Sequence, residues 1–155
     1  MHTFLMKNLF QPDTAVEVKQ RIASLTSASP RLWGKMSAAQ AVAHCSLSVK
    51  WALGEIEPPR MFVGRLIGGV IKPLVLGDDK PMRRNSPTAP TLLILDERDL
   101  EFEKENLSSL IDRFVVAGSQ AFTTRPHSFF GKLTPDEWAI LTYKHLDHHL
   151  RQFGA

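Results

Sequence analysis

The sequence predicts an all-α protein, a four-helix bundle with long connections and short extra helices. Four segments repeat apolar side chains at helical spacing, and residues typical of helix ends flank them. Only residues 91–95, TLLIL, form a short run that could pair as a strand. The long connections indicate that the bundle is not a simple up-down-up-down one. A chain of 155 residues is expected to fold as one domain, 1–155.

The first helix is expected over residues 13–26, because apolar side chains there fall broadly on one face and SASP at 27–30 is a suitable stop. The second helix begins at SAAQ, residues 37–40, which has the form of a capping box. In a capping box the Ser hydroxyl accepts from the backbone and the Gln side chain reaches back. This helix ends at Gly54, since two prolines follow within five residues.

The middle of the chain is less regular. Residues 60–76 are expected to form one or two short helical pieces, because three glycines and Pro73 interrupt them. Residues 76–90 contain three prolines and predict a long irregular connection. The third long helix is predicted over 97–117 and ends at Gly118.

A loop over residues 119–133 leads to the last helix. This helix starts with TPDE, residues 134–137, a second capping box with proline at the first helical position. It runs to about Phe153.

Composition excludes several classes of protein. A net charge of +3 and a pI near 9.2 are too mild to indicate nucleic-acid binding. The apolar segment 61–76 is shorter than the ~20 residues of a membrane span and contains charges. Residues 1–10 are too short and too polar for a secretory signal. The single cysteine, Cys45, is taken as a core residue and fits a reducing compartment, so the protein is expected to be cytoplasmic.

Half of the six histidines lie in the last helix, within KHLDHHLRQF at 144–153. At 100° per residue, His145 and His149 share one stripe and stand one turn apart, where two imidazoles can reach one ion. His148 lies at the margin of this stripe, and Asp147 lies on the opposite side of the helix. The same stripe carries Trp138, Leu141 and Gln152. The alternative interpretation is that cationic histidines suit the negative end of the helix dipole.

His44, in the middle of the second helix, is the candidate third ligand. Its own stripe carries Gln40, Ser48 and Trp51. A buried imidazole needs a partner, because an unpaired buried polar group costs about 1–3 kcal/mol. One alternative is a core histidine bonded to a carbonyl. The other is that three neutral imidazoles share one ion and leave part of its coordination sphere open, which is the form of a catalytic metal site.

A histidine in the middle of the second helix, together with H-x-x-H-H-x-x-Q on the last, resembles the DinB/YfiT superfamily of metal-binding four-helix bundles. NSPTAP, PHSFFGKLTPDEW and YKHLDHHLRQFG are similar to an uncharacterised bacterial branch of it, and the resemblance spans nearly the whole chain. It implies that His44, His145 and His149 are the metal ligands. Gln152 matches the trailing glutamine of the motif, whereas Arg151 stands where a glycine is usual.

The resemblance also implies a divalent ion, nickel or zinc first and iron or manganese as alternatives. Superfamily members include thiol transferases, thiol-dependent isomerases and hydrolases. The chain is therefore expected to be a metal-dependent enzyme acting on a small molecule, such as a low-molecular-weight thiol, by thiol transfer or hydrolysis. The alternative is a non-catalytic helical module with a vestigial or structural metal site, which forms a homodimer through residues 61–76.

Several residues are candidates for the second shell or the substrate pocket: Gln40, Ser48, Trp51, His127, Trp138, His148 and Gln152. For the tryptophans the alternative is core packing, and for His127, which lies in the loop before the last helix, it is solvation. Basic side chains outnumber acidic ones between positions 60 and 84, which fits either an anionic substrate or a solvated face. The basic residues are Arg60, Arg65, Lys72, Lys80, Arg83 and Arg84, and the acidic ones are Asp78 and Asp79.

Overall fold

The structure, a computed structural model, describes residues 6–120 and 126–155. Within these residues the chain is all-helical, with five α-helices, two short 3₁₀ helices and no strands. The elements are α1 (Pro12–Ser24), α2 (Ala38–Ala52), α3 (Phe62–Leu76), η1 (Pro90–Leu92), α4 (Leu100–Ala117), η2 (Gly118–Gln120) and α5 (Pro135–Gln152). The all-α prediction is confirmed.

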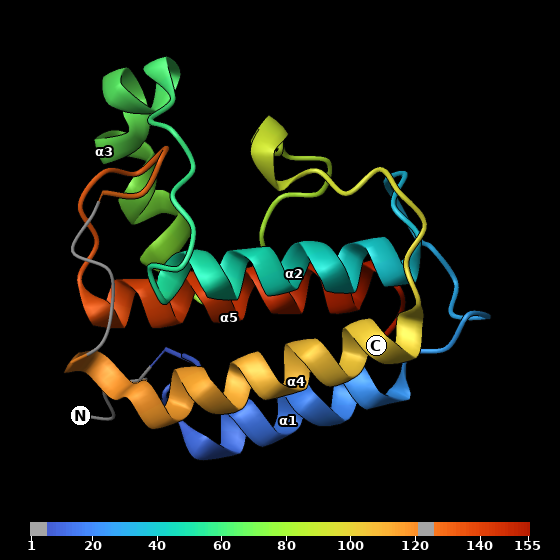
Figure 1. Cartoon of the computed structure of the whole chain (residues 1–155). Coiled ribbons are helices and arrows are strands. Elements are labelled where there is room, and N and C mark those ends of the chain that lie inside the picture. Colours follow the sequence, from blue (N-terminus) through green and yellow to red (C-terminus); the bar gives the residue numbers. More distant parts are fainter. Residues whose placement is uncertain (1–5, 121–125) are drawn as a thin grey trace.

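Helices α1, α2, α4 and α5 lie side by side, and α3 projects away from them near the start of α5 (Figure 1). α2 packs against α4 and α5, and α1 packs against the same two helices from the other side. The core lies between these four, where Val18, Val49, Ile111 and Phe114 are completely buried. Cys45 belongs to this core, as expected, and burial raises the pKa of its thiol.

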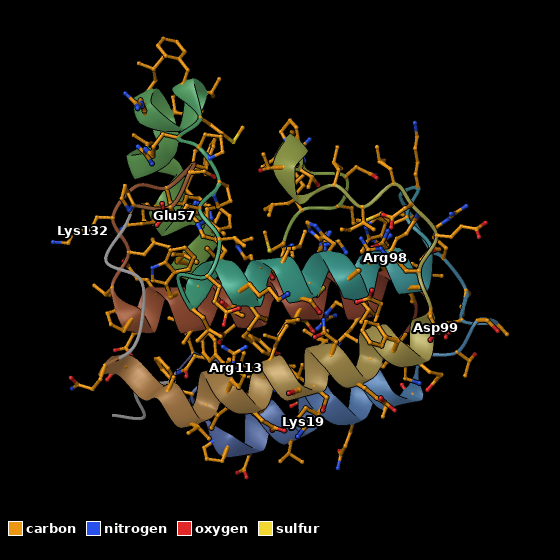
Figure 2. The ribbon with its side chains drawn as sticks, in the orientation of Figure 1. Lys19, Glu57, Arg98, Asp99, Arg113 and Lys132 are labelled. Carbon is orange, nitrogen blue, oxygen red and sulfur yellow. The ribbon has the colours of Figure 1, made fainter. Side chains whose placement is uncertain are left out.

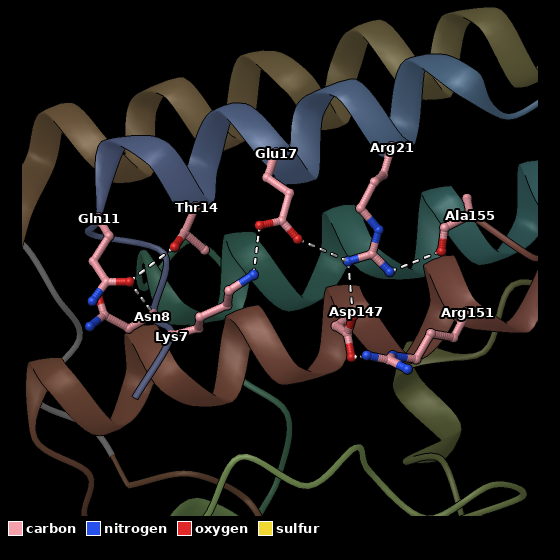
Figure 3. Close-up of polar contacts among 9 residues, drawn as sticks. All are labelled: Lys7, Asn8, Gln11, Thr14, Glu17, Arg21, Asp147, Arg151 and Ala155. Carbon is pink, nitrogen blue, oxygen red and sulfur yellow. Dashed lines mark hydrogen bonds and ion pairs between the residues drawn. The ribbon is translucent and has the colours of Figure 1, made fainter. Parts of the chain in front are cut away.

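Polar contacts hold the outer helices in place. Asp147 of α5 is buried and lies between Arg21 of α1, at 2.8 Å, and Arg151 of its own helix, at 2.7 Å (Figure 3). Lys19 of α1, labelled in Figure 2, pairs with Asp112 of α4 at 2.6 Å, and both side chains are at least partly exposed. Asp147 therefore fastens α1 to α5, on the side of α5 that faces away from the stripe carrying His145 and His149.

Helix starts follow the expected capping signals. Ser37 accepts from the Gln40 N–H at 3.1 Å, and the Gln40 side chain accepts from the Ser37 N–H at 2.9 Å. Thr134 begins α5 with the equivalent pair of bonds and Pro135 at its first position. α4 begins at Leu100 rather than at residue 97, because the Asp99 carboxylate accepts from a backbone N–H of the first turn.

The interruption expected within residues 60–76 was wrong, and the strand that residues 91–95 left open as a possibility is not formed. Residues 62–76 form one continuous helix rather than short pieces, since Gly64 and Gly68 provide contact surface instead of breaks. A Cβ at either position would lie within 2.6 Å of the Phe129 backbone, so only glycine lets α3 approach that turn. Residues 91–95 do not form a strand, because η1 occupies their start and alternate side chains, Leu92 and Ile94, are buried under the loop.

Other boundaries shift by a few residues: α1 ends at Ser24 rather than 26, and α5 at Gln152. The connection after α3 is irregular, as expected, until η1. The loop expected over 119–133 lies partly outside the described residues, at 121–125. Among the described helices, none has both the length and the apolar character that a membrane crossing requires.

Candidate metal centre

Three histidine side chains meet between α2 and α5. His44 comes from the middle of α2, and His145 and His149 come from one face of α5, one turn apart. Their ring centroids are 4.7–4.9 Å apart in all three pairs. One ring nitrogen from each lies within 4.8 Å of the others, so the three could hold a metal ion. The expected convergence of these side chains is therefore present. His44 and His149 are buried, whereas His145 is partly exposed.

Hydrogen bonds at Nδ1 determine which ring nitrogen carries the proton in two of these histidines. His44 Nδ1 lies 2.7 Å from the Leu92 carbonyl oxygen, which can only accept, so Nδ1 is the protonated nitrogen. His149 Nδ1 lies 2.8 Å from Gln152 Oε1. The amide nitrogen of Gln152 donates to the Trp33 carbonyl at 2.9 Å, so its oxygen faces the imidazole and accepts.

The third histidine follows the same rule through a serine. The Ser48 hydroxyl donates its proton to the Cys45 carbonyl at 2.7 Å. Its oxygen is then available only as an acceptor for His145 Nδ1, 3.1 Å away. All three neutral imidazoles thus carry their proton on Nδ1 and have a lone pair on Nε2. Metal-binding histidines usually have this arrangement, with the second nitrogen donating to an outer partner.

The Nε2 atoms of His44 and His145 are 2.9 Å apart. With both protons on Nδ1, two lone pairs face each other at hydrogen-bond distance and repel. Burial lowers the pKa of His44 and His145, and lowers that of His149 to about 3, and the neighbouring imidazoles act in the same direction. Protonation near neutral pH therefore does not relieve the repulsion. A metal cation that binds the Nε2 lone pairs does. The residues fit the metal that the resemblance implies.

Other predicted site residues lie around this cluster at different distances. Ser48 and Gln152 contact it directly, through the hydrogen bonds described above. The ring of His148 lies 5.0 Å from that of His149, but it packs on Trp33 and bonds to the backbone of residue 82. Gln40 is engaged in the N-terminal cap of α2, and it also donates to the Asp96 carbonyl at 3.1 Å.

An aromatic group lies two turns along both helices from the cluster. His127 stacks on Trp51, with ring centroids 4.1 Å apart, and also contacts Trp138. Its Nδ1 accepts from the N–H groups of Phe129 and Phe130, so the proton is on Nε2, the opposite tautomer to the three clustered histidines. His127 is buried rather than solvated, and this burial, with the nearby Arg60 charge, lowers its pKa to about 3.

Sequence reasoning missed the groups that orient the histidines from outside the helices. Two are the backbone carbonyls of Leu92 and Trp33, and no sequence signal marks them, because every residue has a carbonyl. A third is Gly34, which has a φ of +75° and where an added Cβ would lie 2.6 Å from the Gln152 amide nitrogen. A glycine in the loop before α2 was the sign in the sequence that could have indicated this close approach.

A family model described as "Protein of unknown function (DUF1569)" matches residues 7–155, nearly the whole chain. No curated protein and no solved structure matches the chain.

Proposed function

This chain belongs to the DUF1569 family, and we propose that it binds a divalent transition-metal ion through His44, His145 and His149. On this basis it is a metal-dependent enzyme of the DinB/YfiT type that acts on a small molecule. One observation carries the metal proposal: each of the three imidazoles donates from Nδ1 to a separate acceptor, which leaves three Nε2 lone pairs in one place. The packing of α1, α2, α4 and α5 supports assigning the fold to the four-helix bundles of that superfamily.

Imidazole nitrogens suit zinc, nickel and iron better than magnesium or calcium. Nickel or zinc is the proposed ion, with iron or manganese as alternatives. A divalent ion held by three neutral imidazoles supplies Lewis acidity, which can activate a water for hydrolysis or a thiol for transfer. The chain's own contribution is orientation, since Leu92, Ser48 and Gln152 hold the three rings at their Nδ1 atoms.

We propose that a small molecule reaches the centre from the side of His145, the least buried of the three ligands. No carboxylate belongs to the cluster among the described residues, and Asp147 is paired with Arg21 and Arg151 elsewhere. Thiol transfer needs no protein base, because the ion itself favours the deprotonated thiol. A low-molecular-weight thiol is therefore the proposed substrate class, with ester or amide hydrolysis as the other reaction.

A structural metal site in a non-catalytic module is the second candidate function. The burial of His44 and His149 favours it, because structural sites are closed. The two candidates differ in whether a further ligand can reach the ion at the His145 side.

Metal content of protein purified without a histidine tag tests the proposal. We expect nearly one equivalent of metal by elemental analysis, and its loss in His145→Ala with an unchanged far-UV circular dichroism spectrum. His148→Ala is the matched control: it removes a histidine of the same helix that lies outside the cluster, and it should keep the metal. Metal-free wild-type protein, even after incubation with zinc or nickel, would contradict the proposal.

Cobalt substitution then separates enzyme from structural site. Addition of 2-mercaptoethanol to the cobalt protein should produce a thiolate-to-cobalt absorption band if the ion accepts a further ligand. A spectrum that does not respond to thiol would favour the structural site.

A further inference from the structure

α3 carries a large apolar surface that the other described residues, 6–120 and 126–155, do not cover. Six of its side chains are between 44 and 74% exposed: Phe62, Val63, Leu66, Ile67, Val70 and Leu74. The helix buries little more than Gly64, Gly68 and Leu76. It contacts α5 on one side and otherwise projects away from the packed helices, with side chains extending outward (Figures 1 and 2). We refer to the six exposed residues as the α3 face.

The six side chains share one side of the helix. At 100° per residue they fall within about 140° of one another. The two charged residues of this helix, Arg65 and Lys72, fall on the other side, and Lys72 is paired there with Glu137 at 3.0 Å. The α3 face is therefore continuous and uncharged over the length of the helix.

The exposed area of the α3 face is large enough for a protein–protein interface. From the exposed fractions, and with a free Val, Leu, Ile or Phe side chain exposing on the order of 100–200 Å², the face leaves about 600 Å² open. Patches of roughly this size are the largest that monomers expose. Two such faces in contact bury about 1,200 Å², the lower limit for a specific protein–protein interface.

The nearby charges do not favour an anionic surface such as a membrane as the occupant. Four of the six basic residues between 60 and 84 already have partners within the chain, one of them Lys80, which pairs with Asp78 at 3.5 Å. Arg60 donates to the His127 carbonyl, Lys72 pairs with Glu137, and Arg84 lies over the Trp33 ring at 4.2 Å. An uncharged apolar face is complementary to another uncharged apolar face, and a second copy of this chain supplies one.

Gly69 lies at the midpoint of α3, and a Cβ built there would meet nothing within 4 Å. On the helical wheel it borders the α3 face beside Phe62 and Leu66. Two antiparallel helices that cross at a glycine can approach closely, with the large side chains of each copy packing on both sides of the crossing. The position of this glycine fits a two-fold axis through the centre of the helix.

We propose that two copies of this chain form a symmetric dimer through the α3 face, with α3 packed antiparallel against α3 near Gly69. The dimer would also support the surroundings of the metal centre. The Met61 N–H donates to the Ser128 carbonyl beside His127, and Lys144 donates to the Val75 carbonyl from the position before His145. This inference does not depend on the metal proposal.

Sedimentation velocity and light scattering of the full chain, with and without added metal, test the dimer. Wild-type protein should be dimeric at about 100 µM and dissociate on dilution. Leu66→Glu should raise the dimer dissociation constant at least about 100-fold, because two unpaired carboxylates would enter the interface. Gly69→Leu should also give monomers, and because its added side chain meets open space in the single copy, the fold should be kept.

Val116→Glu is the matched control, since Val116 is 87% exposed on α4, away from the α3 face, and this variant should remain dimeric. Far-UV circular dichroism and thermal unfolding of each variant establish that it is folded. A monomeric wild type at about 100 µM, or dimers that survive both α3 substitutions, would overturn the proposal. A monomeric wild type that co-floats with vesicles of phosphatidylserine and phosphatidylcholine, while Leu66→Glu does not, would overturn the dimer in favour of membrane binding.

Discussion

Replacement of Gln152 by leucine should weaken metal binding about 10- to 100-fold, the usual effect of removing the hydrogen-bond acceptor behind a ligating histidine. Gln152 is 2% exposed, and its oxygen accepts from His149 Nδ1 at 2.8 Å. Without this acceptor the imidazole of His149 can turn, or can carry its proton on Nε2, where the proton would occupy the ligand position. In free energy the expected loss is about 1.4–2.8 kcal/mol.

The assay is competition for zinc between the protein and a chromophoric chelator at fixed pH. Gln20→Leu is the matched control, since it makes the same exchange at an exposed position of α1 and should leave affinity unchanged. Gln152→Glu separates orientation from packing. The carboxylate still accepts from His149 and should keep or raise zinc affinity, while the Trp33 carbonyl loses its donor and stability falls.

Wild-type zinc affinity in Gln152→Leu would refute the tautomer argument, because His149 would then bind without its Nδ1 partner or would not be a ligand. Equal losses of affinity in Gln152→Leu and Gln152→Glu would show that Gln152 acts through packing alone.

Other predictions concern the rest of the fold. The pKa of His127 is about 3 in the folded state against about 6.5 in the unfolded state, so the unfolded chain binds a proton at higher pH than the folded chain does. In metal-free protein, with chelator present, the contribution of His127 to the free energy of unfolding should therefore fall by about 1.4 kcal/mol for each pH unit below 6.5. The three ligand histidines, whose pKa values are also lowered, change stability in the same direction. In urea titrations at several pH values, the free energy of unfolding of His127→Asn should therefore depend less steeply on pH than that of the wild type. Asp147→Ala should cost about 3 kcal/mol in chemical unfolding, because Arg21 loses its buried partner, yet should leave metal content unchanged. Thr134→Ala should lower stability by about 1 kcal/mol through loss of the α5 cap.

Much of the scaffold could be predicted from sequence, because its determinants are local. The two capping boxes are four-residue signals, and both begin helices where expected. Helical periodicity placed His145 and His149 on one stripe and His44 on another, and the packing of α2 on α5 brings the two stripes together. The prediction worked where the relevant geometry is that of a single helix.

It failed where the partner lies far along the chain. Gly64 and Gly68 look like helix breakers, since glycine costs about 1 kcal/mol per residue in a helix interior. Their contact with the Phe129 backbone, some 60 residues away in sequence, makes them part of a continuous helix. For the TLLIL run the sequence left a strand possible. Its hydrophobicity instead accompanies burial of Leu92 and Ile94, and a short apolar run alone does not distinguish these two outcomes.

The histidines show how far residue type alone can identify a ligand. His127 and His149 are both buried, both lie next to aromatic rings, and both have a pKa lowered to about 3. They differ in what faces Nδ1: backbone N–H groups for His127, and an amide oxygen for His149. A donor there places the ring proton on Nε2, and an acceptor leaves Nε2 with a lone pair. The group that faces Nδ1, a loop backbone for His127 and the Gln152 side chain of α5 for His149, therefore decides which of these histidines is able to bind a metal through Nε2.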